Sequence, residues 1–405
     1  MTDIGLSKTL DRVKPSPTLA VTRKTNEMRR AGIDVISLGA GEPDFPTPDH
    51  VKAAAIEAIN TNRTGYTTVD GIAELKSAIV SKFKRDNGLS YQTDEINVGP
   101  GGKFVICNAL LATLNPGDEV IIPAPYWVSY PDMVRLGDGN PIIVETSLGD
   151  GFILQPGALE AAITPRTRWL ILNTPSNPTG AAYTREQLRA LADVLLRHPH
   201  IMIIADDMYE HIVYDGFAFS TLAEIEPALF GRTLTVNGAS KAYSMTGWRI
   251  GFAGGPKPLI KAMAKVMSQT TSNPCSISQW ASVAALNGDH NFLVDRNIAF
   301  KRRRDLVVSM LNDADGIECA VPLGAFYVFP SCAGVIGKTT PGGKTLHTDE
   351  DFCTALLEEK NVATVFGAAF GLSPFFRISY ATDDETLREA CTKIQAFCAD
   401  LSSRL

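Results

Sequence analysis

Short hydrophobic runs rich in β-branched residues alternate along much of the chain with longer segments of helical character. The runs at residues 95–98, 119–122, 169–172, 201–205 and 233–236 have the length and composition of buried strands. Strands that alternate with helices are typical of a parallel α/β sheet. We therefore expect an α/β fold whose sheet is covered by helices, but the pattern does not give the order of the strands.

The segment after Tyr183 predicts one of these helices in detail. Thr184 and Gln187 have the spacing of a capping box, in which the two side chains bind the first free N–H groups of a helix. The apolar positions that follow repeat at helical spacing: Leu188, Leu191, Ala192 and Leu195. We expect this helix to cover one face of the sheet.

A change of pattern near residue 300 indicates a second structural unit. Four consecutive basic residues at 301–304 mark the expected start of a long helix, and residues 325–329 resemble a strand. The N-terminal segment is rich in proline, which favours an arm and a crossing strand over a separate domain. We expect a large domain at residues 49–299 and a small α+β domain made of residues 1–48 and 300–405.

Composition excludes several classes of protein. The 405 residues are 45% hydrophobic and 20% charged, as in a soluble globular protein with more than one core. A net charge of −6 without long runs of one sign gives no basic surface for nucleic acid. No stretch has the length of a membrane span or of the apolar core of a signal peptide. We expect a cytoplasmic protein without nucleic-acid or membrane partners.

Cysteine and histidine spacing gives no sign of a metal site. The seven cysteines lie far apart and never form Cys-x-x-Cys, so we expect reduced thiols and no disulfide framework. None of the six histidines has the spacing of metal ligands. We therefore expect no bound metal.

The most informative segment is residues 237–251, which follows a predicted strand and is dense in small residues. Such a turn lets a ligand approach the backbone. Lys241 lies among apolar and small groups, where it loses its proton more easily, and a neutral amine attacks an aldehyde. Arg249 can bind a phosphate through two hydrogen bonds. Taken by itself, however, this segment is explained equally well as an ordinary surface loop that happens to carry a lysine and an arginine.

Asp206 lies at the carboxyl end of a predicted strand, where ligands of open α/β sheets bind. The same strand resembles the metal-binding strand of nucleoside triphosphatases, but their phosphate loop is missing. The two Gly-Lys-Thr sequences lack the required earlier glycine, because Cys332 and Lys338 occupy its place. Gly99-Pro-Gly-Gly-Lys can bind an anion at a helix start, yet Phe104 breaks the dinucleotide fingerprint. The sequence thus favours a phosphate-bearing ligand of another kind.

Two more polar residues stand out. Asn177 belongs to the turn-forming sequence at residues 173–180, and a purely structural turn explains it when it is taken alone. Arg377 lies in an apolar strand, and a buried arginine needs an anionic partner. That partner is either a substrate carboxylate or a structural acid.

Taken together, these motifs resemble the fold type I (class I) aminotransferases over essentially the whole chain. The shared motifs run in order: Gly39-Ala-Gly-Glu-Pro-Asp, Tyr66-Thr, Gly101-Gly-Lys, Pro125-Tyr-Trp-Val, Asn177-Pro-Thr-Gly, Asp206 with Tyr209, Ser240-Lys with Arg249, Thr271-Ser-Asn-Pro, Gly324-Ala-Phe-Tyr and Arg377. The resemblance implies a large domain with a mostly parallel seven-stranded sheet, a small α+β domain and pyridoxal 5′-phosphate as cofactor. It also implies a homodimer with shared active sites.

The resemblance implies a role for each matching residue. Lys241 holds the cofactor as a Schiff base and then moves the proton of the substrate, while Asp206 keeps the ring nitrogen protonated. Asn177 and Tyr209 bind the ring oxygen and Trp127 stacks on the ring. The phosphate is held by Ser240, Arg249, the backbone of Gly101 and Gly102, and Tyr66 of the neighbouring subunit. The substrate is contacted by Gly41, Trp127, Asn177 and Arg377, of which the last binds its α-carboxylate.

One departure from the family bears on the substrate. The best-known aspartate aminotransferases bind the distal carboxylate with an arginine shortly before Thr-Ser-Asn-Pro, and residues 264–270 contain none. The chain instead resembles bacterial subgroup Ib, which implies that Lys103 recognises the acidic side chain. Lys103 as an ordinary lysine at a helix start remains the alternative. Asp207, where many relatives have glutamate, should leave the contact of Asp206 intact.

The implied reaction is a ping-pong transfer of the amino group from L-aspartate to 2-oxoglutarate, which gives oxaloacetate and L-glutamate. An aspartate/prephenate aminotransferase of broader specificity is an alternative, because prephenate is also a dicarboxylate and could serve as a further acceptor. A carbon–sulfur β-lyase on the same fold is an alternative that uses the same lysine and aspartate. A cofactor-binding transcription factor with an aminotransferase-like domain is a further alternative. It ranks last, because such proteins carry an added DNA-binding module and we see no spare domain for one in this sequence.

Overall fold

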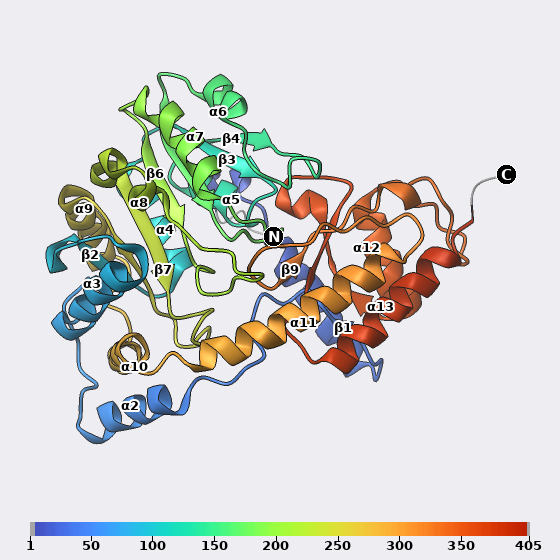
Figure 1. Ribbon diagram of the computed structural model, residues 1–405, viewed down its shortest axis with the longest axis horizontal. Coiled ribbons are helices and arrows are strands. Elements are labelled where there is room, and N and C mark those ends of the chain that lie inside the picture. The colour runs from blue at the N-terminus through green and yellow to red at the C-terminus, as the bar shows by residue number, and fades with distance from the viewer. Residues whose placement is uncertain (1–4, 403–405) are drawn as a thin grey trace.

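The computed structural model describes residues 5–402, and a seven-stranded sheet forms its centre (Figure 1). The strand order is β2-β8-β7-β6-β5-β3-β4. The strands are β2 (Ile96–Gly99), β3 (Glu119–Ala124), β4 (Asn140–Glu145), β5 (Thr167–Asn173), β6 (Met202–Asp206), β7 (Thr233–Gly238) and β8 (Gly251–Gly254). β8 is antiparallel to both of its neighbours and the other pairs are parallel. The mostly parallel seven-stranded sheet is therefore confirmed.

Helices pack on both faces of this sheet, which explains its nearly continuous hydrophobic strands. Trp169 and Ile171 of β5 belong to the same buried cluster as the apolar residues of α4, whereas Leu170 and Leu172 belong to the cluster formed with α7. The helices of this part are α2 (Asp49–Asn60), α3 (Ala73–Asn87), α4 (Gly102–Thr113), α5 (Tyr130–Leu136), α6 (Pro156–Ala162), α7 (Arg185–Leu196), α8 (Leu222–Ile225), α9 (Lys257–Ser268) and α10 (Ser276–Asn287).

The predicted capping box of α7 is present. The Thr184 hydroxyl accepts from the N–H of Gln187 at 3.3 Å, and the Gln187 side chain accepts from the N–H of Thr184 at 2.9 Å. Leu188, Leu191 and Leu195 then face the sheet and are fully buried. The sequence therefore predicted both the start of this helix and the side that it buries.

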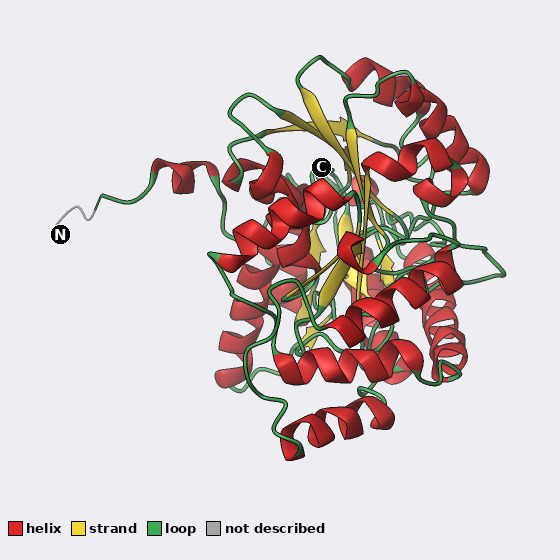
Figure 2. Cartoon of the chain, turned by 90° about the vertical axis from the view of Figure 1, so that its left-hand side faces the viewer, coloured by secondary structure: helices red, strands yellow, loops and turns green. Residues whose placement is uncertain are grey.

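The C-terminal part and the N-terminal segment are built together. β1 (Ile36–Ser37) pairs in parallel with β10 (Val362–Ala363), and β9 (Tyr327–Val328), β11 (Val365–Phe366) and β12 (Phe376–Ser379) form a second small sheet. The helices here are α1 (Pro17–Arg30), α11 (Phe292–Asn312), α12 (Asp349–Lys360) and α13 (Asp384–Ala399). Short 3-10 helices complete the chain: η1 (Lys8–Arg12), η2 (Thr93–Glu95), η3 (Pro227–Arg232), η4 (Ala333–Val335) and η5 (Gly367–Phe370). Figure 2 shows the arm that carries η1 projecting from the body of the molecule.

Two expectations for this part were wrong. Residues 301–304 lie in the middle of α11, which begins at Phe292 because Phe292 and Leu293 pack against the core beside the large sheet. Arg303 and Arg304 are buried and pair with acidic side chains of other segments, so they are not a solvated helix start. The predicted strand at residues 325–329 shrinks to Tyr327–Val328, because Ala325 has a φ of 56° that a strand cannot contain.

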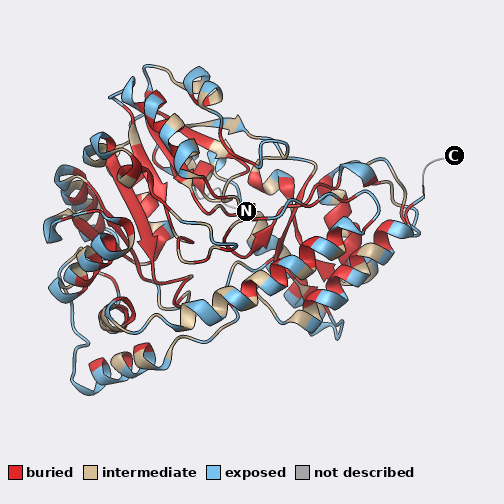
Figure 3. Ribbon diagram, viewed as in Figure 1, coloured by how far each residue is buried: buried red, intermediate tan, exposed pale blue. Residues whose placement is uncertain are grey.

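The buried residues gather along the large sheet and between α11, α12 and α13 (Figure 3). α11 runs continuously across residues 299 and 300, and it joins the two parts of the molecule in Figure 1. Among residues 5–402, no helix combines the length and the apolar character that crossing a bilayer requires.

Candidate active site

A cavity of about 440 Å³ lies at the carboxyl ends of β5, β6 and β7. Residues from the loops after these strands line it together with α1, the segment at residues 39–42, and β12. The cavity brings together most of the residues singled out in the sequence: Gly41, Gly102, Lys103, Trp127, Asn177, Asp206, Tyr209, Ser240, Lys241, Arg249 and Arg377. The chain therefore assembles one polar site from segments that are far apart in sequence.

Lys241 follows β7 and directs its amine into the cavity. Its Nζ donates to the carbonyl of Gly41 at 2.6 Å. Desolvation, followed by the positive charge of Arg377, lowers the pKa of Lys241 to about 8. Part of the lysine population is thus neutral near physiological pH, as a nucleophilic or proton-accepting amine requires.

Asp206 ends β6 and is almost fully buried. The hydroxyl of Tyr130 donates to its Oδ2 at 2.5 Å, and the N–H of Met208 donates to Oδ1 at 3.3 Å. Burial raises the pKa of Asp206 to about 6, although the bond from Tyr130 acts in the opposite direction. The carboxylate therefore remains mostly ionised at neutral pH and can hold a protonated ring nitrogen.

Glycines at the start of α4 let the backbone meet Arg249 closely. A Cβ on Gly101 would lie 2.3 Å from Nη2 of Arg249, and one on Gly251 would lie 2.2 Å from the backbone nitrogen of Gly102. Gly101 also has a φ of 95°, which disfavours any side chain. Gly102 at the helix N-terminus, Arg249 and Ser240 all line the cavity, and together these groups suit a phosphate.

Arg377 on β12 is buried between the rings of Tyr327 and Phe370, at 4.7 and 4.9 Å from their centres. Its Nη1 donates to Oδ1 of Asn177 at 2.8 Å and its Nη2 to the carbonyl of Gly39 at 2.5 Å. Its Nε has no hydrogen-bond partner, and no carboxylate within residues 5–402 forms an ion pair with it. The structural acid that the sequence left open is thus not found in the described chain.

Lys103 provides another cation in the cavity lining. Its Nζ lies 5.1 Å from the ring centre of Trp127. Desolvation lowers the pKa of Lys103, and the positive charge of Arg249 adds to this effect. A ligand carboxylate that reached this amine would stabilise its charged form.

Two predicted residues lie outside the cavity lining. Tyr66 is 94% exposed on the loop between α2 and α3, so its predicted contact with a neighbouring subunit stays a prediction. Gly101 lies so close to the Arg249 guanidinium that a side chain there would clash with it, but Gly101 does not line the cavity.

Sequence reasoning missed several lining residues. Tyr130 lies three positions after Trp127, and Tyr327 ends the motif at residues 324–327 and exchanges a hydrogen bond of 2.8 Å with Tyr209. Tyr327 belongs to a quoted motif and Tyr130 closely follows another, so their position was the available signal. Thr18 and Leu19 of α1 also line the cavity, and no motif marked them.

These groups fit the expected pyridoxal phosphate. An anion-binding end, a buried carboxylate, an aromatic ring and a lysine of lowered pKa meet in one cavity. The unpartnered Nε of Arg377 in the same lining offers a donor to a substrate.

Comparisons with known proteins agree with this geometry. The family described as aminotransferase class I and II matches residues 33–394. An aspartate/prephenate aminotransferase of Cereibacter sphaeroides is 64% identical over 397 residues, which cover 98% of this chain and 99% of the relative. The crystal structure of an aspartate aminotransferase from Rhizobium meliloti has a TM-score of 0.96 and 58% sequence identity; the match covers 99% of this chain and 100% of the Rhizobium chain. The structure of the Thermus thermophilus aspartate aminotransferase with maleate has a TM-score of 0.90 and 43% sequence identity; the match covers 97% of this chain and 99% of the Thermus chain.

Proposed function

Because the chain belongs to the aminotransferase class I and II family, we propose that it transfers the amino group of L-aspartate to 2-oxoglutarate. The products are oxaloacetate and L-glutamate. Membership of the family makes the chain a pyridoxal-phosphate-dependent transaminase. The choice of a dicarboxylate is supported by one observation, the presence of Arg377 and Lys103 in the lining of the same cavity.

Pyridoxal phosphate supplies an aldehyde that takes up the amino group and a ring that accepts the electron pair of the substrate carbon. Asp206 would keep the ring nitrogen protonated, since its carboxylate stays mostly ionised near neutral pH. Arg249, Ser240 and the N-terminus of α4 would bind the phosphate. Asn177 and Tyr209 would hydrogen-bond the ring oxygen, and Trp127 would stack on the ring.

Lys241 moves the proton. With a pKa of about 8 its amine can accept a proton from the substrate carbon and return it, because both protonation states are accessible near neutral pH. Gly41, whose carbonyl already contacts Nζ, brings the segment at residues 39–42 against this amine.

Arg377 binds the α-carboxylate of the substrate and Lys103 binds the distal one. The Arg377 guanidinium is oriented by Asn177 and by the carbonyl of Gly39, and its buried position makes a charge-assisted bond strong. Aspartate and 2-oxoglutarate both carry the two carboxylates that such a pair of cations requires.

Prephenate is a second candidate substrate. It is also a dicarboxylate, and the relative with 64% identity is named an aspartate/prephenate aminotransferase. The same two cations would bind it. Comparing the rates with prephenate and 2-oxoglutarate as acceptors, at equal concentration, decides between the two specificities.

The decisive experiment follows the absorbance band of the bound cofactor while L-aspartate and then 2-oxoglutarate are added. We expect the band to disappear with the first compound and to return with the second, and Lys241→Ala to show neither change. A band that is indifferent to aspartate contradicts the role of Lys103. Protein that acquires no band from added pyridoxal phosphate contradicts the whole proposal, and pyruvate release from cystathionine without an oxo acid indicates a β-lyase.

We extend the proposal to the assembly of the protein. The chain forms a cytoplasmic homodimer, in which Tyr66 reaches the phosphate of the neighbouring active site from its exposed loop. Residues 49–299 form the cofactor-binding domain, and residues 1–48 with 300–405 form the small one. Light scattering tests the dimer, and a Tyr66→Phe variant with weaker cofactor binding supports the shared site.

A further inference from the structure

A buried polar network lies beside the cavity and has no part in the proposed function. Oε1 of Glu210 pairs with Nζ of Lys82, and its Oε2 accepts from Nδ2 of Asn87 at 2.6 Å. Lys82 also donates to Oδ1 of Asn87 at 2.6 Å, and Nδ2 of Asn237 donates to Oε1 of Glu210 at 2.7 Å. All four residues are buried. We call Lys82, Asn87, Glu210 and Asn237 the buried brace.

The brace connects the two segments that carry the main cofactor residues. Besides Glu210, Nδ2 of Asn237 donates to the carbonyl of Asp207 at 3.2 Å, and Oδ1 of Asn237 accepts from the N–H of Gly238 at 2.7 Å. Asp207 directly follows Asp206, and Gly238 lies three residues before Lys241. One side chain thus holds the end of β6 against the end of β7.

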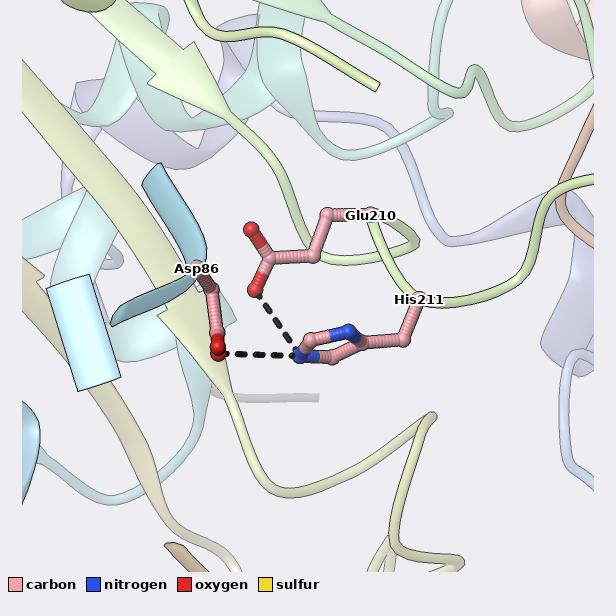
Figure 4. A group of neighbouring side chains, drawn as sticks. All are labelled: Asp86, Glu210 and His211. Atoms are coloured by element: carbon pink, nitrogen blue, oxygen red, sulfur yellow. Dashed lines mark ion pairs between the residues drawn. The ribbon is translucent and has the colours of Figure 1, made fainter. Parts of the chain in front are cut away.

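Two further groups adjoin the brace and raise the question of a metal (Figure 4). Nε2 of His211 lies 3.2 Å from Oε1 of Glu210 and 3.5 Å from Oδ2 of Asp86. The charges of both carboxylates are already balanced, because Lys82 pairs with Glu210 and Nε of Arg85 lies 2.7 Å from Oδ1 of Asp86. We therefore assign no metal to this group.

A buried ion pair contributes little net stability, since the desolvation of both charges offsets their attraction. The geometry points instead to a positioning role. We propose that the buried brace fixes the segment of Asp206 against the segment of Lys241, and thereby sets the affinity for the cofactor and its orientation. This inference rests on the proposed function, which assigns Asp206 and Lys241 to the cofactor.

The variant Asn237→Ala tests the brace, because it removes the side chain that touches both segments. Loss of its hydrogen bonds should weaken pyridoxal phosphate binding by about 5- to 10-fold, as measured by titration of the apoprotein. The visible circular dichroism of the bound cofactor should also fall, because this signal depends on the orientation of the ring. The matched control is Asn108→Ala, which removes another buried amide that donates to the carbonyl of Met263 at 3.0 Å. It should lower thermal stability but leave affinity and dichroism unchanged.

Rescue gives a second test that does not depend on Asn237→Ala being soluble. Glu210→Gln leaves the buried charge of Lys82 with only the longer ion pair to Oδ2 of Asp86, 3.8 Å away, and should weaken cofactor binding. Lys82→Met with Glu210→Gln removes both charges and keeps an acceptor for Asn237. We expect the double variant to recover most of the affinity. The role of the brace would be overturned if Asn237→Ala kept wild-type affinity and dichroism. It would also be overturned if Glu210→Gln and the double variant both bound the cofactor as the wild type does. Neither result would affect the proposed function. Wild-type protein that binds no pyridoxal phosphate would overturn the proposed function together with it.

Discussion

The assignment of Lys103 to the distal carboxylate makes a prediction about substrate selectivity. Replacing it by methionine removes the charge and keeps the aliphatic stem that lies near Trp127. A hydrogen bond to a charged group contributes about 1.5–3 kcal/mol. This corresponds to a loss of about 10- to 150-fold in kcat/KM for L-aspartate.

The assay compares L-aspartate with L-alanine, which has an α-carboxylate but no distal one. In Lys103→Met the value for aspartate should fall by the stated factor, while that for alanine should change by less than about 2-fold because Arg377 still binds the α-carboxylate. The control is Lys393→Met, since this lysine lies on α13 and pairs with Glu389 at 2.8 Å outside the cavity. It should leave both values unchanged.

An equal fall for both substrates would refute the reasoning, because it would show that Lys103 supports the cofactor and not the side chain of the substrate. The neighbouring charge of Arg249 makes this alternative physically reasonable, since that charge already lowers the pKa of Lys103. Cofactor affinity measured in the same variant separates the two roles.

The remaining predictions concern three other groups of the cavity. Arg377→Gln should lower kcat/KM for every amino-acid substrate by at least about 100-fold without weakening cofactor binding, as checked by kinetics and by cofactor titration. Tyr130→Phe removes the bond that lowers the pKa of Asp206, so this pKa should rise above about 6. As the pH is lowered, the variant should then lose activity at a higher pH than the wild type does. An acid limb of the pH–rate profile that does not move would contradict the role of Tyr130. The rate at which apoprotein takes up pyridoxal phosphate should rise with pH around the Lys241 pKa of about 8, and a midpoint near the usual lysine value would count against desolvation of this amine.

The sequence predicted those strands whose hydrophobic runs are long enough to be recognised by themselves. The central residues of β5, β6 and β7 are buried on both faces of the sheet, so each strand contains a run of mostly apolar side chains. β4 and β8 were not predicted. β4 is a half-exposed edge strand that contains Pro141, and β8 consists of Gly-Phe-Ala-Gly. β8 exists because Gly251 lets the backbone approach Gly102, which is a tertiary contact that no local pattern reveals.

The site was predictable where a residue follows a strand or belongs to a spaced motif. Asp206 comes directly after a hydrophobic run and Lys241 lies in the short loop after the next one, and the structure places both in the cavity lining. The contribution of α1 could not be predicted, because it depends on the path of the N-terminal segment across the molecule. The pairing of β1 with β10 fixes that path, and each of these strands has only two residues.

The fold also explains how two groups with opposite charge acquire useful pKa values at once. Asp206 pairs with Val236 across neighbouring parallel strands, so the carboxylate and the lysine that follows β7 meet at the same edge of the sheet. Desolvation there acts on both: it raises the pKa of Asp206 to about 6 and lowers that of Lys241 to about 8. These two values lie on either side of neutral pH, so the carboxylate stays charged while the amine can gain and lose a proton. Each charge also limits the shift of the other, since Asp206 raises the pKa of Lys241 and Lys241 lowers that of Asp206. A change that separated the two strand ends would therefore weaken the influence of each charge on the pKa of the other. The residues that hold β6 against β7 thus matter to the chemistry without touching the substrate.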